Sequence, residues 1–552
     1  MRLCIAGLAF SLLASDLTTL KSEWEPIGPD GGSVHVLAID RARTSVVLAA
    51  TRNGLLFRSE DQARHWTPLP LPRFPNVTIH ALLIDPQRNG TYFVGLNDPN
   101  HRYGGLWRSD DSGLHWRRVE ALAGRSVLSL AFRDSEPRLF AAGTDQGVYL
   151  SEDRGESWRA ISPADNLEIK GIVSLAFDPR EPDTLYAGTT HLPWKTTDRG
   201  ANWTSVHDGM IDDSDVFSIL TDRERAGRVY ASACSGIYSS LDGGLKWQRA
   251  KGIPADNRRT YVITQDRDYP NLLYAGTTAG LWKSADAGLT WKKLHDAQVN
   301  SLVVDPHDGR VMYIATDGGG VLKSVDAGRT WAIRNRGLVN RSVSSALFTS
   351  SGLYATTMYE NSYGGLFLLP KGKSDWTLVA NQSKLLGENI RNLRAGPNRL
   401  VGDTFSGRIV SADGGRTWAR ISGKPIELPP PVLEGTPAFE VYANLRTRLA
   451  SHPNGLFRSL DNGKSWVKVN KGLPEGFIRT VSCHPTRTTQ CFALQGANLY
   501  GSRDGGQSWQ MIGASTTIGT VLVKLLIDPA SDGTIYAISA DQGLYRRQIV
   551  AY

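Results

Sequence analysis

The stretch Ser109-Asp110-Asp111-Ser112-Gly113-Leu114-His115-Trp116 follows the pattern Ser/Thr-x-Asp-x-Gly-x-x-Trp. In this octapeptide the aspartate caps a turn by accepting backbone N–H bonds and the glycine supplies a positive φ, while the hydroxyl closes the turn and the tryptophan packs beneath it. The pattern recurs along the chain, with its aspartate at Asp61, Asp111, Asp153, Asp198, Asp242, Asp286, Asp326, Asp413, Asp461 and Asp504. Ala63 replaces the glycine in the first copy, and a degenerate copy runs from Leu366 to Trp376.

The tryptophans define the size of the repeating unit. Twelve of the 15 tryptophans, from Trp24 to Trp509, recur at intervals of 40 to 50 residues. Within one interval, apolar runs such as 172–177 and 184–189 are separated by turns and predict four short strands. Four short strands in about 40 to 50 residues form one blade of a β-propeller. The predicted fold class is therefore all-β, a β-propeller with about twelve four-stranded blades.

The two ends of the chain complement each other. The last period, 521–549, supplies three strands and lacks the octapeptide, whereas one extra strand is expected near Trp24. We expect these segments to close one blade together, because closure removes an open sheet edge. Twelve blades exceed the four to eight that are usual in one ring, so we expect two propellers in tandem. If the termini share a blade, the chain crosses twice between the rings.

Loop lengths suggest how the blades are grouped. Two pairs of long loops lie six blades apart, at 96–105 and 358–365, and at 190–194 and 444–455. This spacing favours six blades in each ring over seven and five. The expected division is a first propeller at 21–290 and a second at 291–552.

Composition excludes several classes of protein. Of the 552 residues 41% are hydrophobic and 21% are charged, which is typical of a globular chain rather than a disordered one. The net charge of +8 is scattered as single arginines instead of stripes, so we expect no nucleic-acid partner. No apolar run reaches the length of a membrane span, and we expect a monomer without a transmembrane segment.

The first 20 residues and the cysteines bear on the compartment. Arg2 followed by the apolar run 3–14 resembles a signal peptide, although its cleavage site is poor, and favours a periplasmic or secreted protein. Cys483 and Cys491 flank a short turn, where they either form a disulfide or remain two buried thiols. No cluster of cysteine and histidine has the spacing of a zinc site, and we expect no metal and no cofactor.

The repeated octapeptide resembles the Asp box, the bacterial neuraminidase repeat, and the resemblance covers residues 22–549. The Asp-box propeller superfamily includes sialidases, tandem-propeller xyloglucanases, sortilin-type receptors and photosystem II assembly-factor-like proteins. The resemblance implies the fold strongly and the activity weakly, because the box lies at the blade periphery in these families. Absence of a cysteine-rich module after the blades argues against a true sortilin receptor.

The loops on one face of each ring are the default place for a binding site in a propeller. The polar and aromatic residues expected there are His101, Arg102, Tyr103, Asp212, Asp213, Arg258, Arg259, Tyr359, Glu360 and Tyr363. All 15 tryptophans occupy two slots of the repeat, so only tyrosines remain to stack on a sugar. The acidic run 212–215 lacks the alternating spacing of a calcium loop.

Two functions remain open. We favour an exported, non-enzymatic propeller that binds a protein or polysaccharide through its loop faces, because no catalytic set is recognisable. The alternative is a tandem-propeller glycoside hydrolase that acts on a β-glucan-type polysaccharide between the rings. The segment Gly28–Ser33 resembles the start of the xyloglucanases, but Asn53 occupies the place where that resemblance implies a first catalytic aspartate, and an amide there would remove a general base.

Overall fold

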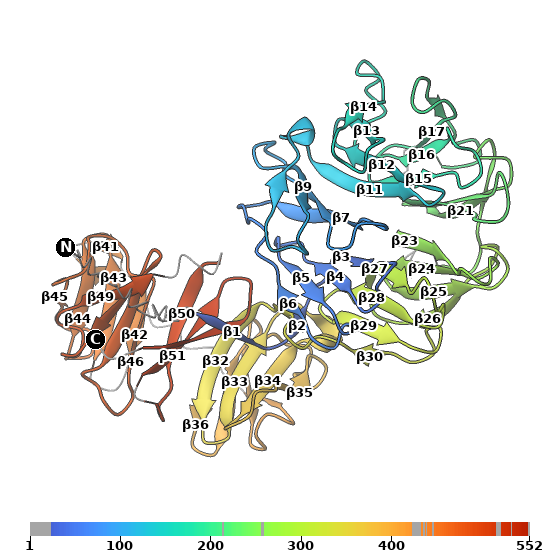
Figure 1. The fold of residues 1–552 in the computed structure, drawn as a ribbon. Coiled ribbons are helices and arrows are strands. Elements are labelled where there is room, and N and C mark those ends of the chain that lie inside the picture. Colours follow the sequence, from blue (N-terminus) through green and yellow to red (C-terminus); the bar gives the residue numbers. More distant parts are fainter. Residues whose placement is uncertain are drawn as a thin grey trace, which may run out of the picture.

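The computed structural model describes residues 24–211, 215–254, 259–421, 432–433, 436–437, 439–443, 447–514, 520–531 and 533–549. Residues 1–20, where the signal peptide is expected, lie outside this part of the chain. In the described residues the chain forms twelve four-stranded antiparallel sheets, which we number as blades 1 to 12 (Figure 1). No helix among these residues is long and apolar enough to span a membrane.

Blades 1 to 7 follow one another along the chain. Their strands are β3–β6 (Val36–Ile39, Val47–Ala50, Leu56–Ser59, Thr67–Pro68), β7–β10 (Thr78–Ile84, Tyr92–Asn97, Gly105–Ser109, Arg117–Arg118), β11–β14 (Val127–Arg133, Glu136–Thr144, Gly147–Ser151, Arg159–Ala160), β15–β18 (Ser174–Phe177, Leu185–Gly188, Pro193–Thr196, Thr204–Ser205), β19–β22 (Val216–Thr221, Val229–Ala233, Gly236–Ser240, Trp247–Arg249), β23–β26 (Thr260–Gln265, Leu273–Thr277, Gly280–Ser284, Lys292–His295) and β27–β30 (Val299–Val304, Met312–Thr316, Gly320–Ser324, Ala332–Ile333).

Blades 8 to 12 continue to the end of the chain. Their strands are β32–β35 (Val343–Thr349, Gly352–Thr357, Gly365–Pro370, Thr377–Asn381), β36–β39 (Asn392–Gly396, Arg399–Asp403, Arg408–Ser411, Ala419–Ile421), β42–β45 (Phe439–Ala443, Arg448–His452, Gly455–Ser459, Val467–Lys468), β46–β49 (Thr480–Cys483, Cys491–Gln495, Asn498–Ser502, Gln510–Ala514) and β50–β52 (Leu522–Ile527, Thr534–Ser539, Leu544–Gln548) with β1 (Glu25–Gly28). The short elements are β2 (Gly31–Gly32), β31 (Val339–Asn340), β40 (Val432–Leu433), β41 (Thr436–Pro437), and the 3-10 helices η1 (Glu120–Leu122) and η3 (Asn361–Tyr363).

The first seven blades form one closed ring. The first strand of each blade packs against that of the next, from β3 to β27, and β27 packs back against β3. The expected grouping of six and six is therefore wrong, and so is the boundary at residue 290, because blade 7 belongs to the first ring. Of the last five blades, 8 packs on 9, 10 on 11, 11 on 12, and 12 on 8. Loop lengths misled the prediction because the rings are defined by contacts between the first strands of neighbouring blades, which the loops do not report.

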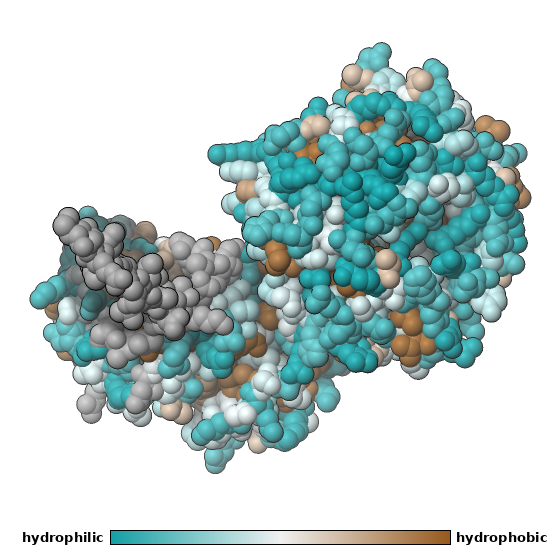
Figure 2. Space-filling model, in the orientation of Figure 1, coloured by the Kyte–Doolittle hydropathy of each residue, from teal (hydrophilic) through white to brown (hydrophobic). Residues whose placement is uncertain are grey.

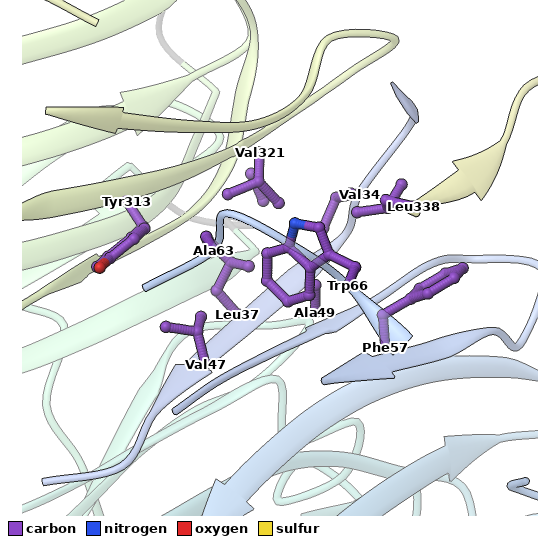
Figure 3. Close-up of a cluster of buried hydrophobic side chains, with 11 residues drawn as sticks. Val34, Leu37, Val47, Ala49, Phe57, Ala63, Trp66, Tyr313, Val321 and Leu338 are labelled. Atoms are coloured by element: carbon purple, nitrogen blue, oxygen red, sulfur yellow. The ribbon is translucent and has the colours of Figure 1, made fainter. Parts of the chain in front are cut away.

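Trp66 lies where the first ring closes. It packs with Val34, Leu37 and other residues of blade 1 against Tyr313, Val321 and Leu338 from the blade 7 side (Figure 3). The indole Nε1 of Trp66 donates to the carbonyl of Arg334, 2.7 Å away. Burial of so many apolar side chains across this seam favours closure between blades 1 and 7.

The ends of the chain meet in blade 12. Strand β1 pairs antiparallel with β52, as expected from the missing strand, and in Figure 1 the blue β1 lies beside the red end of the chain. The chain therefore crosses between the rings twice. The two crossings run side by side, because β2 pairs parallel with β31, with Gly31 opposite Val339 and Gly32 opposite Asn340.

The octapeptide turns have the expected local geometry. In the turn after β9, Ser109 Oγ donates to Asp111 and accepts the N–H of Gly113, whose φ is +90°. Asp111 Oδ1 accepts the N–H groups of Leu114 and His115. In each of the other nine copies the Ser or Thr hydroxyl likewise donates to the aspartate, which accepts one or two backbone N–H groups.

Cys483 and Cys491 form a disulfide between β46 and β47. The two residues are direct partners in the strand register, with Cα atoms 4.0 Å apart. Of the two alternatives that the sequence leaves open, the structure therefore has the bridge.

Candidate functional site

The two crossing strands form the junction between the rings. A Cβ on Gly31, where φ is +107°, would lie 2.4 Å from the Arg341 guanidinium, and one on Gly32 would lie 2.0 Å from the Asn340 carbonyl oxygen. Glycine is therefore required at both positions, because only it permits this approach of the two strands. The close contact at the junction therefore explains why glycines occur in the segment Gly28–Ser33.

A row of hydrogen-bonded side chains crosses this junction. Ser33 Oγ donates to Asp317 Oδ1 at 2.6 Å, and Asn340 Nδ2 donates to the Ser33 carbonyl at 2.8 Å. Asn53 Nδ2 then donates to Asn340 Oδ1 at 2.8 Å and reaches Asp541 Oδ2 at 3.4 Å. Asp317 and Asn53 belong to turns of the first ring and Asp541 to a turn of the second, so the row connects carboxylates from both rings.

All three turns occupy the same slot of the repeat. Asn53 follows β4, Asp317 follows β28 and Asp541 follows β51, each between the second and third strands of its blade. These turns lie at the end of the ring where the crossing strands enter, since Ser33 precedes β3. Turns of this kind present side chains to the loop face, where binding sites of propellers are expected.

Asp541 is an accessible carboxylate in a polar setting. Its side chain is 37% exposed, and Arg73 Nη2 lies 3.1 Å from Oδ2. Thr520 Oγ1 donates to the other carboxylate oxygen. Arg73 also donates to the Asn53 carbonyl at 2.9 Å, so one guanidinium joins the turns of the two rings. Arg73 thus places a positive charge directly beside the Asp541 carboxylate.

Arg341 and Glu360 form a buried ion pair behind this row. Their side chains are 5% and 7% exposed, and Arg341 Nη1 lies 2.5 Å from Glu360 Oε2. Arg341 also donates to the carbonyl oxygens of Asp30, Gly318 and Tyr363. Burial raises the pKa of Glu360, while Arg341 opposes that shift. This pair ties the crossing strands to blades 7 and 8.

His35 and His80 lie at the same end of the first ring. Their rings meet edge to face with centroids 5.1 Å apart, and His35 Nδ1 is buried without a hydrogen-bond partner among the described residues. Burial, with smaller contributions from His80 and Arg52, lowers the pKa of His35 to about 3, and burial together with the charge of Arg52 lowers that of His80 to about 4. Both imidazoles are therefore neutral in the folded protein near pH 7.

We expect this histidine pair to weaken the fold in acid. Below about pH 6.5 the unfolded chain takes up protons that the folded chain excludes until about pH 4, so the free energy of unfolding falls by about 1 kcal/mol per pH unit for each histidine. Urea unfolding at pH 7, 5.5 and 4.5 measures the loss, and His35→Gln and His80→Gln should reduce its slope. His115→Gln, at an exposed histidine, is the control; equal slopes in all variants would contradict the assignment.

The structure places the predicted site residues in different settings. Tyr103 stacks on Phe74 with ring centroids 4.4 Å apart, and Arg102 lies over the Tyr103 ring. The exposed His101 contacts Asp145 at 3.3 Å. The N–H groups of Arg102 and Tyr103 donate to buried Asp98, so hydrogen bonds within the loop hold its conformation.

The remaining predicted residues fall into three groups: some lie outside the described part of the chain, some lie in loops away from the junction, and some lie at the junction. Asp212, Asp213 and Arg258 fall outside the described residues. Arg259 lies over the Phe217 ring, and Tyr359 is 67% exposed. Glu360 and Tyr363 contact Arg341 and therefore belong to the junction instead of an open surface.

Sequence reasoning singled out Asn53 but missed Arg73, Asp317 and Asp541. The two aspartates could have been found from their position in the repeat, because each lies in the turn between the second and third strands of its blade. A comparison of that slot between periods shows that Asp541 matches Asn53, whereas Asp317 matches Arg52, one residue earlier in its turn. Arg73 has no such signal, because it lies in the loop between β6 and β7.

Comparisons with known proteins give one family-model match and several relatives. The model described as Sortilin-Vps10 (Sortilin, neurotensin receptor 3) matches residues 104–214. A xyloglucanase from a Paenibacillus species is 25% identical over 174 residues, which cover 25% of this chain and 17% of that enzyme. A probable oligoxyloglucan-reducing end-specific xyloglucanase of Neosartorya fischeri is 31% identical over 88 residues, 15% of this chain and 10% of that protein. The matches thus span less than a fifth of these relatives' own length.

Solved structures match over nearly the whole chain. The GH74 xyloglucanase from Xanthomonas campestris has a TM-score of 0.61 at 20% identity and covers 95% of this chain and 87% of its own. This is the fold of the tandem-propeller xyloglucanases. The GH74 enzyme of Niastella koreensis agrees, with a TM-score of 0.59 at 15% identity over 96% of this chain and 100% of its own. These matches agree with the Asp-box superfamily that the repeat indicates.

Proposed function

We propose that this chain is a glycoside hydrolase that acts on a β-glucan-type polysaccharide at the junction of its two rings. The xyloglucanase relatives and the shared fold support this alternative of the sequence analysis better than the non-enzymatic scaffold preferred there. The observation on which the proposal rests is the exposed carboxylate of Asp541, joined through Asn53 to the first ring.

Hydrolysis of a glycosidic bond needs one carboxyl group to protonate the leaving oxygen and a second to activate water or attack the sugar. In our proposal Asp541 activates water, because Arg73 balances its charge, and Asp317 protonates the leaving oxygen. Asn53, Asn340 and Ser33 lie between them and supply amide and hydroxyl groups that hydrogen-bond to sugar hydroxyls.

One observation favours a second candidate, a protein that binds the polysaccharide without cleaving it. Asn53 occupies the place where the resemblance to xyloglucanases implies a catalytic aspartate, and an amide cannot accept the proton of an attacking water. The hydrogen bonds from Asn53 to Asn340 and Asp541 would remain useful in binding.

We infer that the protein works outside the cytoplasm. The disulfide between Cys483 and Cys491 supports this location, because such bridges persist in oxidising compartments and are rare in the cytosol. A polysaccharide substrate agrees with the same location.

The test is to incubate the purified chain with xyloglucan and mixed-linkage β-glucan. Release of new reducing ends reports cleavage, and affinity gel electrophoresis in the same polysaccharides reports binding. We expect both cleavage and retardation. Retardation without cleavage would overturn the hydrolase in favour of the binding protein, and absence of both would overturn the two candidates together.

A further inference from the structure

The far end of the first ring has its own charged cavity. Each blade turns from its first to its second strand there, at the end of the inner strands opposite the crossing strands. After β3, β19 and β23 the second residue of this turn is an arginine: Arg41, Arg223 and Arg267. The equivalent residue is a proline in blades 2, 4 and 7 and Asp134 in blade 3. Three of the seven equivalent turn positions at this end of the ring therefore carry a positive charge.

These arginines line hollows in the structure. A cavity of about 380 Å³ is bounded by Arg41, Asp134 and Arg223, together with apolar residues of the inner strands. A second cavity of about 490 Å³ shares these three residues and adds Arg267 and His307. The volumes match those of sites for small molecules rather than for whole proteins.

The charges in the cavity do not cancel. Arg41 forms an ion pair with Asp134 and stacks over the Phe132 ring, and its carbonyl accepts a hydrogen bond from His307. Asp305 also lines the larger cavity, but it is buried and accepts the N–H of His307 in its own turn. Arg41 is thereby paired with Asp134, and with Asp305 also counted the three arginines of the larger cavity exceed its aspartates by one.

Arg223 and Arg267 are available for a ligand. Arg267 contacts the Pro306 carbonyl, and its other N–H groups have no hydrogen-bond partner in the part of the chain that the structure describes. Arg223 has no ion pair among the residues that the structure describes. Loss of solvation in the cavity wall lowers the pKa of Arg223; the charges of Arg41 and Arg267 act in the same direction, while those of Asp134 and Asp266 oppose them. A planar guanidinium with free donors is suited to phosphate, sulfate or carboxylate groups.

We propose that this cavity binds a small molecule that bears a phosphate, sulfate or carboxylate group, with Arg223 and Arg267 as its anchors. The site is separate from the ring junction, because the junction lies at the start of β3 and this cavity at its end. Its occupancy is therefore independent of the proposed hydrolysis. A bound anion would link Arg223 of blade 5 to Arg267 of blade 6 at this end of the first ring. It would thereby stabilise the ring.

Isothermal titration calorimetry with inorganic phosphate, sulfate and citrate tests the proposal and separates the three anion chemistries. We expect at least one of them to bind with a Kd below about 1 mM. Arg223→Gln and Arg267→Gln should each weaken that binding by about tenfold or more, because each removes a charged hydrogen-bond donor. The control is Arg329→Gln, at an exposed arginine of an octapeptide turn, which should bind as the unaltered chain does.

A fourth variant keeps the test decisive if the glutamine variants fold poorly. Asp134→Asn releases Arg41 from its ion pair, so anion binding should tighten by about threefold or more. No binding of any of the three anions at about 10 mM, or equal weakening in Arg329→Gln, would overturn the proposal. Unchanged binding in both Arg223→Gln and Arg267→Gln would overturn it as well.

Discussion

Replacement of Asp541 by asparagine is expected to lower kcat for β-glucan cleavage by about 10² to 10⁴-fold, the usual contribution of a positioned acid or base. The amide has the same shape: its oxygen can accept from Arg73, and its NH2 can donate to the Thr520 hydroxyl, which accepts as well as donates, so the turn after β51 should be preserved. It cannot accept a proton from the attacking water. KM should therefore change much less than kcat, and reducing-end assays over a range of substrate concentrations separate the two.

The matched control is Asp308→Asn. Asp308 is an aspartate in a turn of the opposite end of the first ring, where it pairs with Arg310, and its replacement should leave kcat unchanged. Asp317→Asn should lower kcat to a comparable extent if Asp317 is the acid. An Asp541→Asn variant with unaltered kcat, in a preparation that does cleave the polysaccharide, would exclude Asp541 from the chemistry.

The face of the seven-bladed ring that Figure 2 shows is mainly polar. Figure 2 shows hydrophilic residues over most of the seven-bladed lobe, with hydrophobic residues in small separate patches. Single exposed apolar residues such as Leu114 and Leu289 belong to octapeptide turns and need no ligand to explain them.

The blades could be predicted from sequence because their signals are local. The hydroxyl, the aspartate and the glycine of each octapeptide bond within one turn, as Ser109 and Asp111 do, so every copy reports its own geometry. Closure of blade 12 by β1 was predictable for the same reason, since a missing strand leaves a visible gap in the count. The grouping into seven and five was not, because it depends on contacts such as that of Trp66 with Arg334, 268 residues away.

The candidate site was only partly predictable. Asn53 drew notice as a departure from the resemblance to xyloglucanases, yet its partner Asp541 lies 488 residues further along the chain. No local pattern connects two turns at that separation. Glu360 looked like a loop residue because its sequence neighbours, including Tyr359, are polar or aromatic, and only the second crossing strand brings Arg341 to it.

Replacement of Arg341 by methionine is expected to lower the free energy of unfolding by about 3 to 5 kcal/mol, the cost of leaving a buried charge without its partner. The side chain of Arg341 is 5% exposed, and its loss would strand Glu360 and the carbonyl oxygens of Asp30, Gly318 and Tyr363. Those groups belong to the first crossing and to blades 7 and 8, whereas Arg341 itself follows the second crossing strand. The midpoint of urea unfolding measures the loss, and small-angle scattering should show a less fixed arrangement of the two rings.

The double variant Arg341→Met with Glu360→Gln separates the charge from the packing. Without Arg341 the buried carboxylate of Glu360 is the main penalty, so neutralising it should recover at least about 1 kcal/mol relative to Arg341→Met alone. Glu360→Gln by itself should cost less than Arg341→Met, because the guanidinium keeps its three carbonyl acceptors. Additive losses in the double variant would mean that the two side chains stabilise the junction separately, in which case the ion pair is not what joins the rings.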